Sequence, residues 1–200
     1  MHKKLLFSFI ATIGLIIIIL FYLSYFGVKT QNFNNFLQNQ IKSHDSRISL
    51  KLSDVFLKLN LKKLSAKINI KNSNIGIDKN FIGLNNIDID LNLIKFFKKQ
   101  NSVENIQIVT DESEIKEVIK FLNSYKFNIA SSFIYSQINK GKIKAIVNIN
   151  FDKKDKNKFI YGIKGNIKNT NLNLVGFVKL NKINFNFNIV DKKFDFENIL

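Results

Sequence analysis

Two histidines, His2 and His44, are the side chains best suited to acid–base chemistry or metal binding near neutral pH. They lie far apart in the sequence, so neither has a second histidine at metal-ligand spacing. Residues 44–46 are His, Asp and Ser, the residue types of a catalytic triad, but adjacent side chains cannot adopt the triad geometry. This stretch therefore predicts a polar turn rather than a hydrolase site.

The carboxylates offer no better catalytic arrangement. Asp88 and Asp90 are spaced to share one face of a strand; such a pair can do acid–base work, but on a solvated face it serves solubility. Glu112, Glu114 and Glu117 lie near the start of a predicted helix, where the helix dipole favours negative charge. The chain has no cysteine, which excludes disulfides, thiolate metal sites and a cysteine nucleophile. We therefore expect no enzyme, no bound metal and no cofactor.

Most of the chain after residue 46 alternates apolar with polar residues, which predicts half-buried antiparallel strands. Several runs are roughly eight to ten residues long, or roughly 26–33 Å. Asn72, Ser73 and Asn74 predict a turn between two strands. One face of the sheet is almost purely aliphatic or phenylalanine, and we identify it as the candidate binding surface. Its residues are Leu57, Leu59, Leu61, Ile68, Ile70, Ile87, Ile89, Leu91, Ile143, Ala145, Val147, Ile149, Phe151, Phe185, Phe187 and Ile189.

Few helices are available to cover this face. Residues 111–124 predict a helix capped by Asp111 or Ser113, with a short helical turn at residues 93–99 and a loop with a short helix at residues 127–138. The predicted fold class is α+β, mainly antiparallel β. An N-terminal transmembrane helix precedes a long-stranded, curled, groove-like sheet with one or two short helices.

Residues 5–27 contain no charged side chain and are long enough as a helix to cross a hydrocarbon core of roughly 30 Å. The apolar run is longer than that of a signal peptide and lacks an A-x-A-like cleavage pattern, which favours an uncleaved anchor. Basic residues before the span predict a cytoplasmic N-terminus. Anchor positions include Leu5, Ile10, Leu15, Ile19, Leu20, Tyr22, Tyr25 and Phe26, of which the last three suit an interfacial aromatic belt.

Three segments follow from these patterns. Residues 1–29 form the cytoplasmic tip and anchor, residues 30–46 a short amphipathic helix and linker, and residues 47–200 a β-rich domain. The alternating run at residues 194–200 predicts that the sheet continues, either beyond this chain or through a partner.

The net charge of +16, from 31 Lys and Arg against 15 Asp and Glu, could favour anionic partners such as phospholipid headgroups or nucleic acid. The lysines are scattered along polar faces, however, which is also what an AT-rich coding sequence would produce. The predicted anchor and the lack of a nucleic-acid-binding motif argue against nucleic acid.

The order of these pieces resembles the N-terminal region of the AsmA-like family of bacterial envelope proteins. Three stretches carry the resemblance: the anchor with residues 47–52 (RISLKL), residues 87–99 followed by 103–109 (IDIDLNLIKFFKK and VENIQIV), and residues 138–143 (INKGKI). The resemblance implies a single-pass protein of the bacterial inner membrane whose periplasmic β-sheet curls into an apolar groove. It also implies a role in phospholipid transport and outer-membrane homeostasis.

We therefore expect a membrane-anchored periplasmic protein that binds or conducts phospholipid acyl chains, with possible envelope protein partners. One alternative is a membrane-anchored structural or interaction module that assists outer-membrane protein assembly through a free strand edge. Another is a small jelly-roll protein of the kind that passes lipopolysaccharide. A third is a secreted or cell-surface domain released by signal cleavage.

Overall fold

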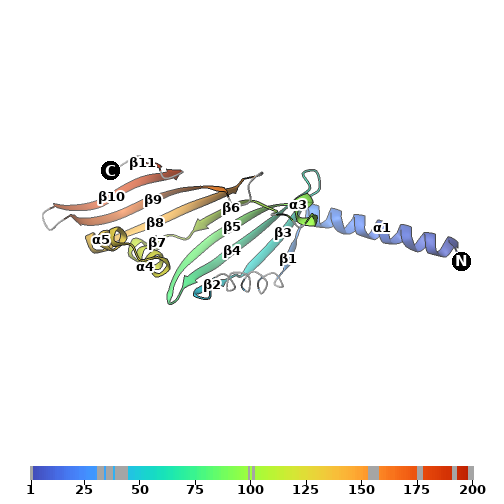
Figure 1. The fold of residues 1–200 in the computed structure, drawn as a ribbon, viewed down its shortest axis with the longest axis horizontal. Helices are drawn as coiled ribbons and strands as arrows, with labels where there is room; N and C mark the ends of the chain where they lie inside the picture. Colours follow the sequence, from blue (N-terminus) through green and yellow to red (C-terminus); the bar gives the residue numbers. More distant parts are fainter. Residues whose placement is uncertain are drawn as a thin grey trace.

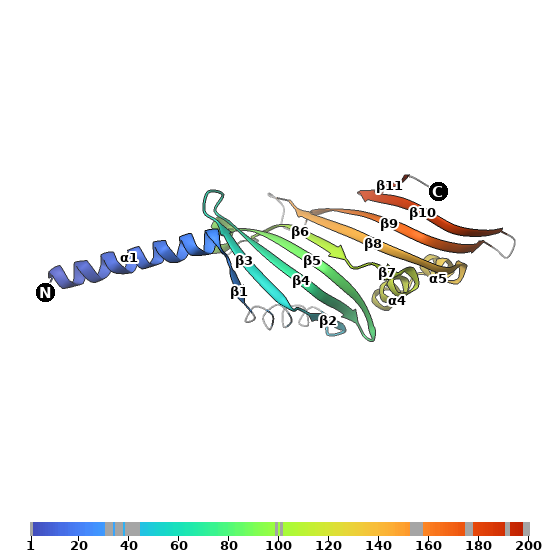
Figure 2. The ribbon, with the colours of Figure 1, turned by 180° about the vertical axis from the view of Figure 1, so that it is seen from behind.

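A computed structural model of the chain describes residues 2–30, 34, 38, 45–98, 100, 102–152, 158–174, 178–190 and 193–197. These residues form an α+β fold in which a long N-terminal helix leads into an open, curled, antiparallel sheet (Figure 1). The helix extends away from one end of the sheet along the long axis of the molecule, as the reverse view in Figure 2 also shows. The predicted fold class is therefore confirmed.

Helix α1 (His2–Tyr25) contains the apolar segment Leu6–Tyr25, with a mean hydropathy of 2.7 and none of it buried. Twenty residues at about 1.5 Å each span roughly the 30 Å of a hydrocarbon core. Among the described residues, α1 is the one helix long and apolar enough to cross a membrane.

Eleven strands of the described chain form one sheet in which every strand pair is antiparallel. The strands are β1 (Val28–Thr30), β2 (Ile48–Lys51), β3 (Asp54–Asn60), β4 (Ser65–Ile77), β5 (Asn80–Asn92), β6 (Val103–Thr110), β7 (Ser113–Glu114), β8 (Ile138–Phe151), β9 (Phe159–Leu174), β10 (Val178–Val190) and β11 (Lys193–Glu197). Their order is β1-β3-β4-β5-β6-β8-β9-β10-β11, with β2 paired to β4 and β7 paired to β8. Strand β1 follows directly from α1, so the helix enters the sheet at an edge strand.

The turn predicted at Asn72, Ser73 and Asn74 is wrong, because β4 runs through it. Asn72 has a φ of 49°, and at this point β4 exchanges one neighbour for another. It pairs with β3 up to Lys71 and with β2 from Asn74 onward. On its other side β4 is paired with β5 both before and after Asn72, with Lys71 opposite Asn86 and Ser73 opposite Leu84, so the ladder carries the strand across the polar break.

Three short helices complete the described fold: α3 (Leu93–Phe97), α4 (Ile115–Tyr125) and α5 (Ile129–Gln137). The predicted cap of the second of these at Asp111 or Ser113 is wrong. Ser113 is taken up by β7, where it pairs with Ile143, so α4 begins only at Ile115. Glu114 occupies the N-cap position without a side-chain capping bond. The short amphipathic helix and linker predicted over residues 30–46 lie mostly outside the described residues.

The buried core has two parts. The first lies on β3, β4 and β5, with Val55 and Ile70 each only 1% exposed, and Val118 and Phe121 of α4 pack against it. The second holds α4 and α5 to the start of β8 and comprises Ile115, Ile119 and Ile138. Gly141 makes this docking possible: its φ is +152°, and an added Cβ would lie 2.7 Å from Ile115 Cδ1.

Candidate functional site

The strand register places a continuous apolar row across seven strands. Residues directly opposite in an antiparallel pair project from the same face, so a chain of registered partners marks one surface. The row runs from β3 to β10, excluding β7, and each member is the Cα partner of the next: Val55, Ile70, Ile87, Ile108, Val147, Ile163 and Ile189.

A second row lies beside the first on the same face: Leu57, Ile68, Ile89, Ile106, Ile149 and Tyr161. Two shorter rows extend it, one joining Ile143, Ile167 and Phe185 and the other Ala145, Gly165 and Phe187. All the residues proposed as a binding surface lie on this apolar face except Leu61, which follows the end of β3. Ile108 on β6 and Ile163 on β9 belong to the same surface but were not among the predicted residues. Which strands flank β6 and β9, and which face each side chain shares with them, follow only from the register.

Cover on the apolar face is uneven. Val55, Ile70 and Ile87 are buried, whereas Ile108 and the three row members beyond it are only partly buried. Helix α4 packs over β4, β5 and the start of β8. Helix α5 packs against the start of β8 and the end of β9. Among the described residues, none of the buried hydrophobic side chains belongs to β9, β10 or β11. This half of the apolar face is therefore only partly covered by the described residues.

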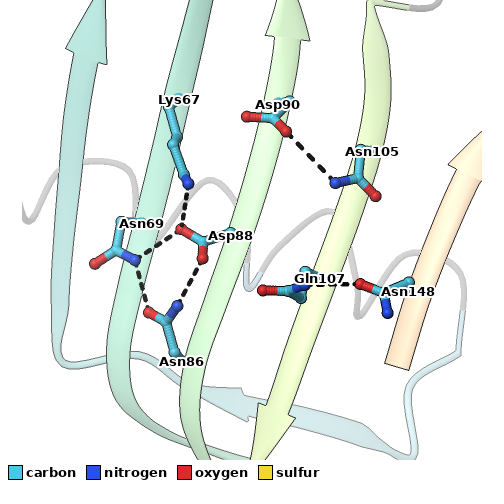
Figure 3. Close-up of polar contacts among 8 residues, drawn as sticks. All are labelled: Lys67, Asn69, Asn86, Asp88, Asp90, Asn105, Gln107 and Asn148. Carbon is cyan, nitrogen blue, oxygen red and sulfur yellow. Dashed lines mark hydrogen bonds and ion pairs between the residues drawn. The ribbon is translucent and has the colours of Figure 1, made fainter. Parts of the chain in front are cut away.

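The opposite face carries a polar ladder over β4, β5, β6 and β8 (Figure 3). Asn69 Nδ2 donates to Asp88 Oδ1 at 2.8 Å, Asn86 Nδ2 donates to Asp88 Oδ2 at 2.8 Å, and Lys67 Nζ lies 3.4 Å from Asp88 Oδ1. On the next two strands, Gln107 Nε2 of β6 donates to Asn148 Oδ1 of β8 at 2.8 Å. Asp88 is thus held by an ammonium and two amides, which fits a structural role for this carboxylate.

Sequence reasoning singled out Asp88 and Asp90 as a pair but missed the ladder around them. Asp90 instead accepts a hydrogen bond from Asn105 at 3.4 Å on the next strand. The signal that could have revealed the ladder is the asparagine at alternate positions of adjacent strands. Because amides both donate and accept, they can link in chains across a sheet.

The other candidate chemical residues make local contacts or lie elsewhere. Two Arg47 hydrogen bonds to Asp45, of 2.7 and 3.1 Å, hold the pKa of that carboxyl below its usual value, because they stabilise its ionised form. Glu112 pairs with Lys142 at 3.1 Å. His2 begins α1, and His44 lies outside the described residues. Within the described part of the chain, no three His, Asp or Glu side chains gather as a metal site would require.

A cleft of about 1120 Å³ opens where α1 meets the sheet. Its walls are the last turns of α1, the turn between β3 and β4, and the end of the polar face nearest α1. The lining includes Phe21, Ser24 and Tyr25 from α1, the lysines Lys58, Lys62, Lys63 and Lys67, and the carboxylates Asp90 and Glu104. Leu59, Leu61 and Phe151 of the predicted surface also reach it, so the cleft borders the apolar face at this end.

The predicted anchor residues lie in α1 up to Tyr25, with Phe26 directly after it. Tyr22, Tyr25 and Phe26 are exposed, and the Phe26 ring lies tilted against both tyrosines, with centroid distances of 5.3 Å to Tyr22 and 6.4 Å to Tyr25. Tyrosines at one end of an apolar helix are typical of a membrane interface, because their rings are amphipathic.

Comparison with known proteins adds no relative: no protein-family model, curated protein or solved structure matches the chain. The candidate site therefore rests on its own geometry, a one-sided apolar sheet joined at its edge to an exposed apolar helix.

Proposed function

We propose that this chain is a membrane-anchored envelope protein that binds phospholipid acyl chains on the apolar face and conducts them across it. The observation that carries the proposal is the continuous row from Val55 to Ile189, partly exposed from Ile108 onward. A closed core would bury such a row along its whole length. The resemblance to the AsmA-like family points in the same direction.

The row is long enough for a whole acyl chain. Seven strands at about 4.8 Å spacing give a path of roughly 29 Å, about twice the roughly 15 Å that the acyl chains of one leaflet span. Burial of each methylene group contributes about 0.8 kcal/mol, so contact along part of this path can hold a chain without a polar anchor. Such binding needs an apolar surface rather than a catalytic residue.

We further propose that α1 is an uncleaved anchor in the bacterial inner membrane, with its N-terminus in the cytoplasm and the sheet in the periplasm. His2, Lys3 and Lys4 precede the span, whereas Lys29 alone follows it closely, as the positive-inside rule requires. Because the chain has no cysteine, a single cysteine at exposed Lys168 would report the side on which the sheet lies. We expect a membrane-impermeant maleimide to label this cysteine in intact spheroplasts. Labelling only after lysis would show that the sheet lies in the cytoplasm.

Site-specific photocrosslinking tests lipid binding in the full chain. Phe187 lies on the apolar face, and its neighbour Asn186 projects from the opposite face. With benzoylphenylalanine at Phe187, irradiation of cells with radiolabelled phospholipid should give a covalent lipid adduct. The same probe at Asn186 should give little. Equal adducts at both positions, or none at Phe187, would contradict the proposal.

A second candidate function is strand capture by an interaction module. Strand β11 pairs only with Asn186 to Val190 of β10, and no described strand pairs with the outer edge of Val178 to Phe185. A free edge can add a strand from a partner. This function would be favoured if a crosslinker at Leu180 captured a polypeptide while the probe at Phe187 gave no lipid adduct. The jelly-roll alternative is less suited, since the described strands form one sheet and a jelly roll packs two.

A further inference from the structure

A cluster of exposed apolar side chains lies at the end of the sheet that carries α1. We call it the basal patch and define it as Leu64, Ile94, Phe96 and Phe97, which are between 47% and 79% exposed. The last three belong to α3, a helix with no buried residue. Leu64 comes from the turn between β3 and β4. Its carbonyl accepts a hydrogen bond from Leu93 N at 2.9 Å, which holds this turn against the start of α3.

Helix α3 is fixed rather than frayed, so its exposed rings are displayed by a defined structure. Asn92 caps it by accepting from Lys95 N at 3.1 Å, and the Asn92 amide donates to Glu104 at 3.1 Å. The rings of Phe96 and Phe97 meet edge to face, with centroids 5.8 Å apart. Adjacent exposed phenylalanines are unfavourable in water, so a partner that removes them from water would stabilise this end.

The position of the patch indicates which partner covers it. In Figures 1 and 2, α3 and the turn between β3 and β4 lie at the end of the sheet from which α1 extends, while α4 and α5 lie toward the other end. Since α1 leads away from the sheet along the long axis, a bilayer that contains α1 must present its surface to this end. Tyr25, near the end of α1, lines the same cleft as Lys62 and Lys63, which adjoin Leu64 of the patch.

The charges around the patch suit an anionic surface. Exposed Lys62 and Lys63 adjoin Leu64, and exposed Lys98 follows the two phenylalanines. The first two also line the cleft beside α1. Apolar rings flanked by lysines are the residue pattern of segments that lie in the headgroup layer of membranes with acidic lipids.

We infer that the basal patch inserts into the headgroup layer of the leaflet on the sheet's side of the membrane, with its lysines bound to anionic phospholipids. This inference rests on the proposed anchoring by α1. Insertion would hold the end of β3 nearest α1 against the bilayer, so that an acyl chain could reach the partly buried Leu57 and Leu59 with little exposure to water. The base of the sheet is then the point of lipid entry or exit.

Tryptophan fluorescence tests the inference directly, because the chain has no natural tryptophan. The full chain carrying Phe97→Trp is reconstituted in vesicles of phosphatidylethanolamine and phosphatidylglycerol with lipids brominated near the headgroup end of the acyl chain. Its emission should be blue-shifted and quenched roughly twofold or more. The matched control is Phe127→Trp between α4 and α5, which is 70% exposed against 79% for Phe97 and should remain unquenched.

A third variant separates failure of this inference from failure of the anchor. Phe9→Trp lies within α1 and should be quenched by lipids brominated deep in the acyl chain. Quenching at Phe9 without quenching at Phe97 would overturn the basal docking and leave the anchor standing. No quenching at Phe9 would overturn the anchor itself. Equal quenching at Phe97 and Phe127 would mean that the sheet lies flat on the bilayer, which also contradicts docking by its base.

The lysines are tested by Lys62→Gln with Lys63→Gln in the Phe97→Trp background. In vesicles with phosphatidylglycerol, quenching should fall toward the level seen in vesicles of neutral lipid alone. Unchanged quenching in the double variant would show that anionic lipid does not bind these lysines. A blue shift at position 97 without quenching by the brominated lipids would mean that something other than lipid covers the patch, which contradicts its insertion.

Discussion

A carboxylate at Val147 is expected to interrupt the apolar row at its centre. Val147 is partly buried on β8 and lies between Ile108 on β6 and Ile163 on β9. In Val147→Asp, the ionised group would demand water where an acyl chain would otherwise lie. The partly exposed position lets the carboxylate remain hydrated in the lipid-free protein, so the sheet should still fold.

The size of the effect follows from the strand spacing. The substitution disturbs the path from Ile108 to Ile163, two spacings of about 4.8 Å, which corresponds to roughly eight methylene groups of an extended chain. A chain on an open face is covered on one side, so each methylene contributes about half of the full 0.8 kcal/mol. The loss is then about 3 kcal/mol, or a roughly hundredfold weaker affinity.

A short-chain fluorescent phospholipid titrated into the full chain in amphipol would measure this change. The matched control is Ile146→Asp, since Ile146 is exposed on the opposite face, next to Lys164 on β9. The control should bind lipid as the parent does, and circular dichroism should show both variants folded. An affinity within about threefold of the parent for Val147→Asp, or an equal loss in the control, would refute the reasoning.

Three further predictions concern stability. Ile119→Ala should lower the free energy of unfolding by about 2–4 kcal/mol in urea titrations because it empties a buried site between α4 and the sheet; Leu122→Ala on the exposed side of the same helix should change it by less than about 0.5 kcal/mol. Gly141→Ala should destabilise the chain by about 1–3 kcal/mol, since the new methyl group would clash with α4 and the backbone angle is strained for alanine. The urea midpoint should fall as pH drops below the usual Asp45 pKa of 3.8, because the Arg47 contact lowers the folded pKa and its contribution is lost as the carboxyl is protonated; Asp45→Asn should remove this part of the acid dependence.

The sequence by itself determined the local structure of most of the chain. An uncharged run from Leu5 must be a helix if it enters lipid, and the structure shows that helix. Alternation such as Ile87-Asp88-Ile89-Asp90 predicts a strand with one apolar face, because successive side chains point to opposite sides. These features depend on near neighbours, so composition and period are enough to predict them.

Tertiary pairing decided where the elements begin and end. The polar residues at Asn72 to Asn74 have the composition of a turn, but the bonds from β4 to β5 carry the strand across them. Ser113 could cap a helix, yet its pairing with Ile143 of β8 keeps it in the sheet. In both places a partner distant in sequence provides hydrogen bonds that outweigh the local preference.

Only the tertiary structure decided that the apolar residues form one surface. Alternation shows which residues of one strand share a face, but shifting a strand by one residue would turn its face over. The register that aligns Ile108 with Val147 and Ile163 is fixed by pairing with residues 39 and 55 positions further along the chain, not by any local signal. The placement of α3, which carries Phe96 and Phe97, beside the end of α1 has the same origin, since the sheet brings distant turns to one end (Figure 1).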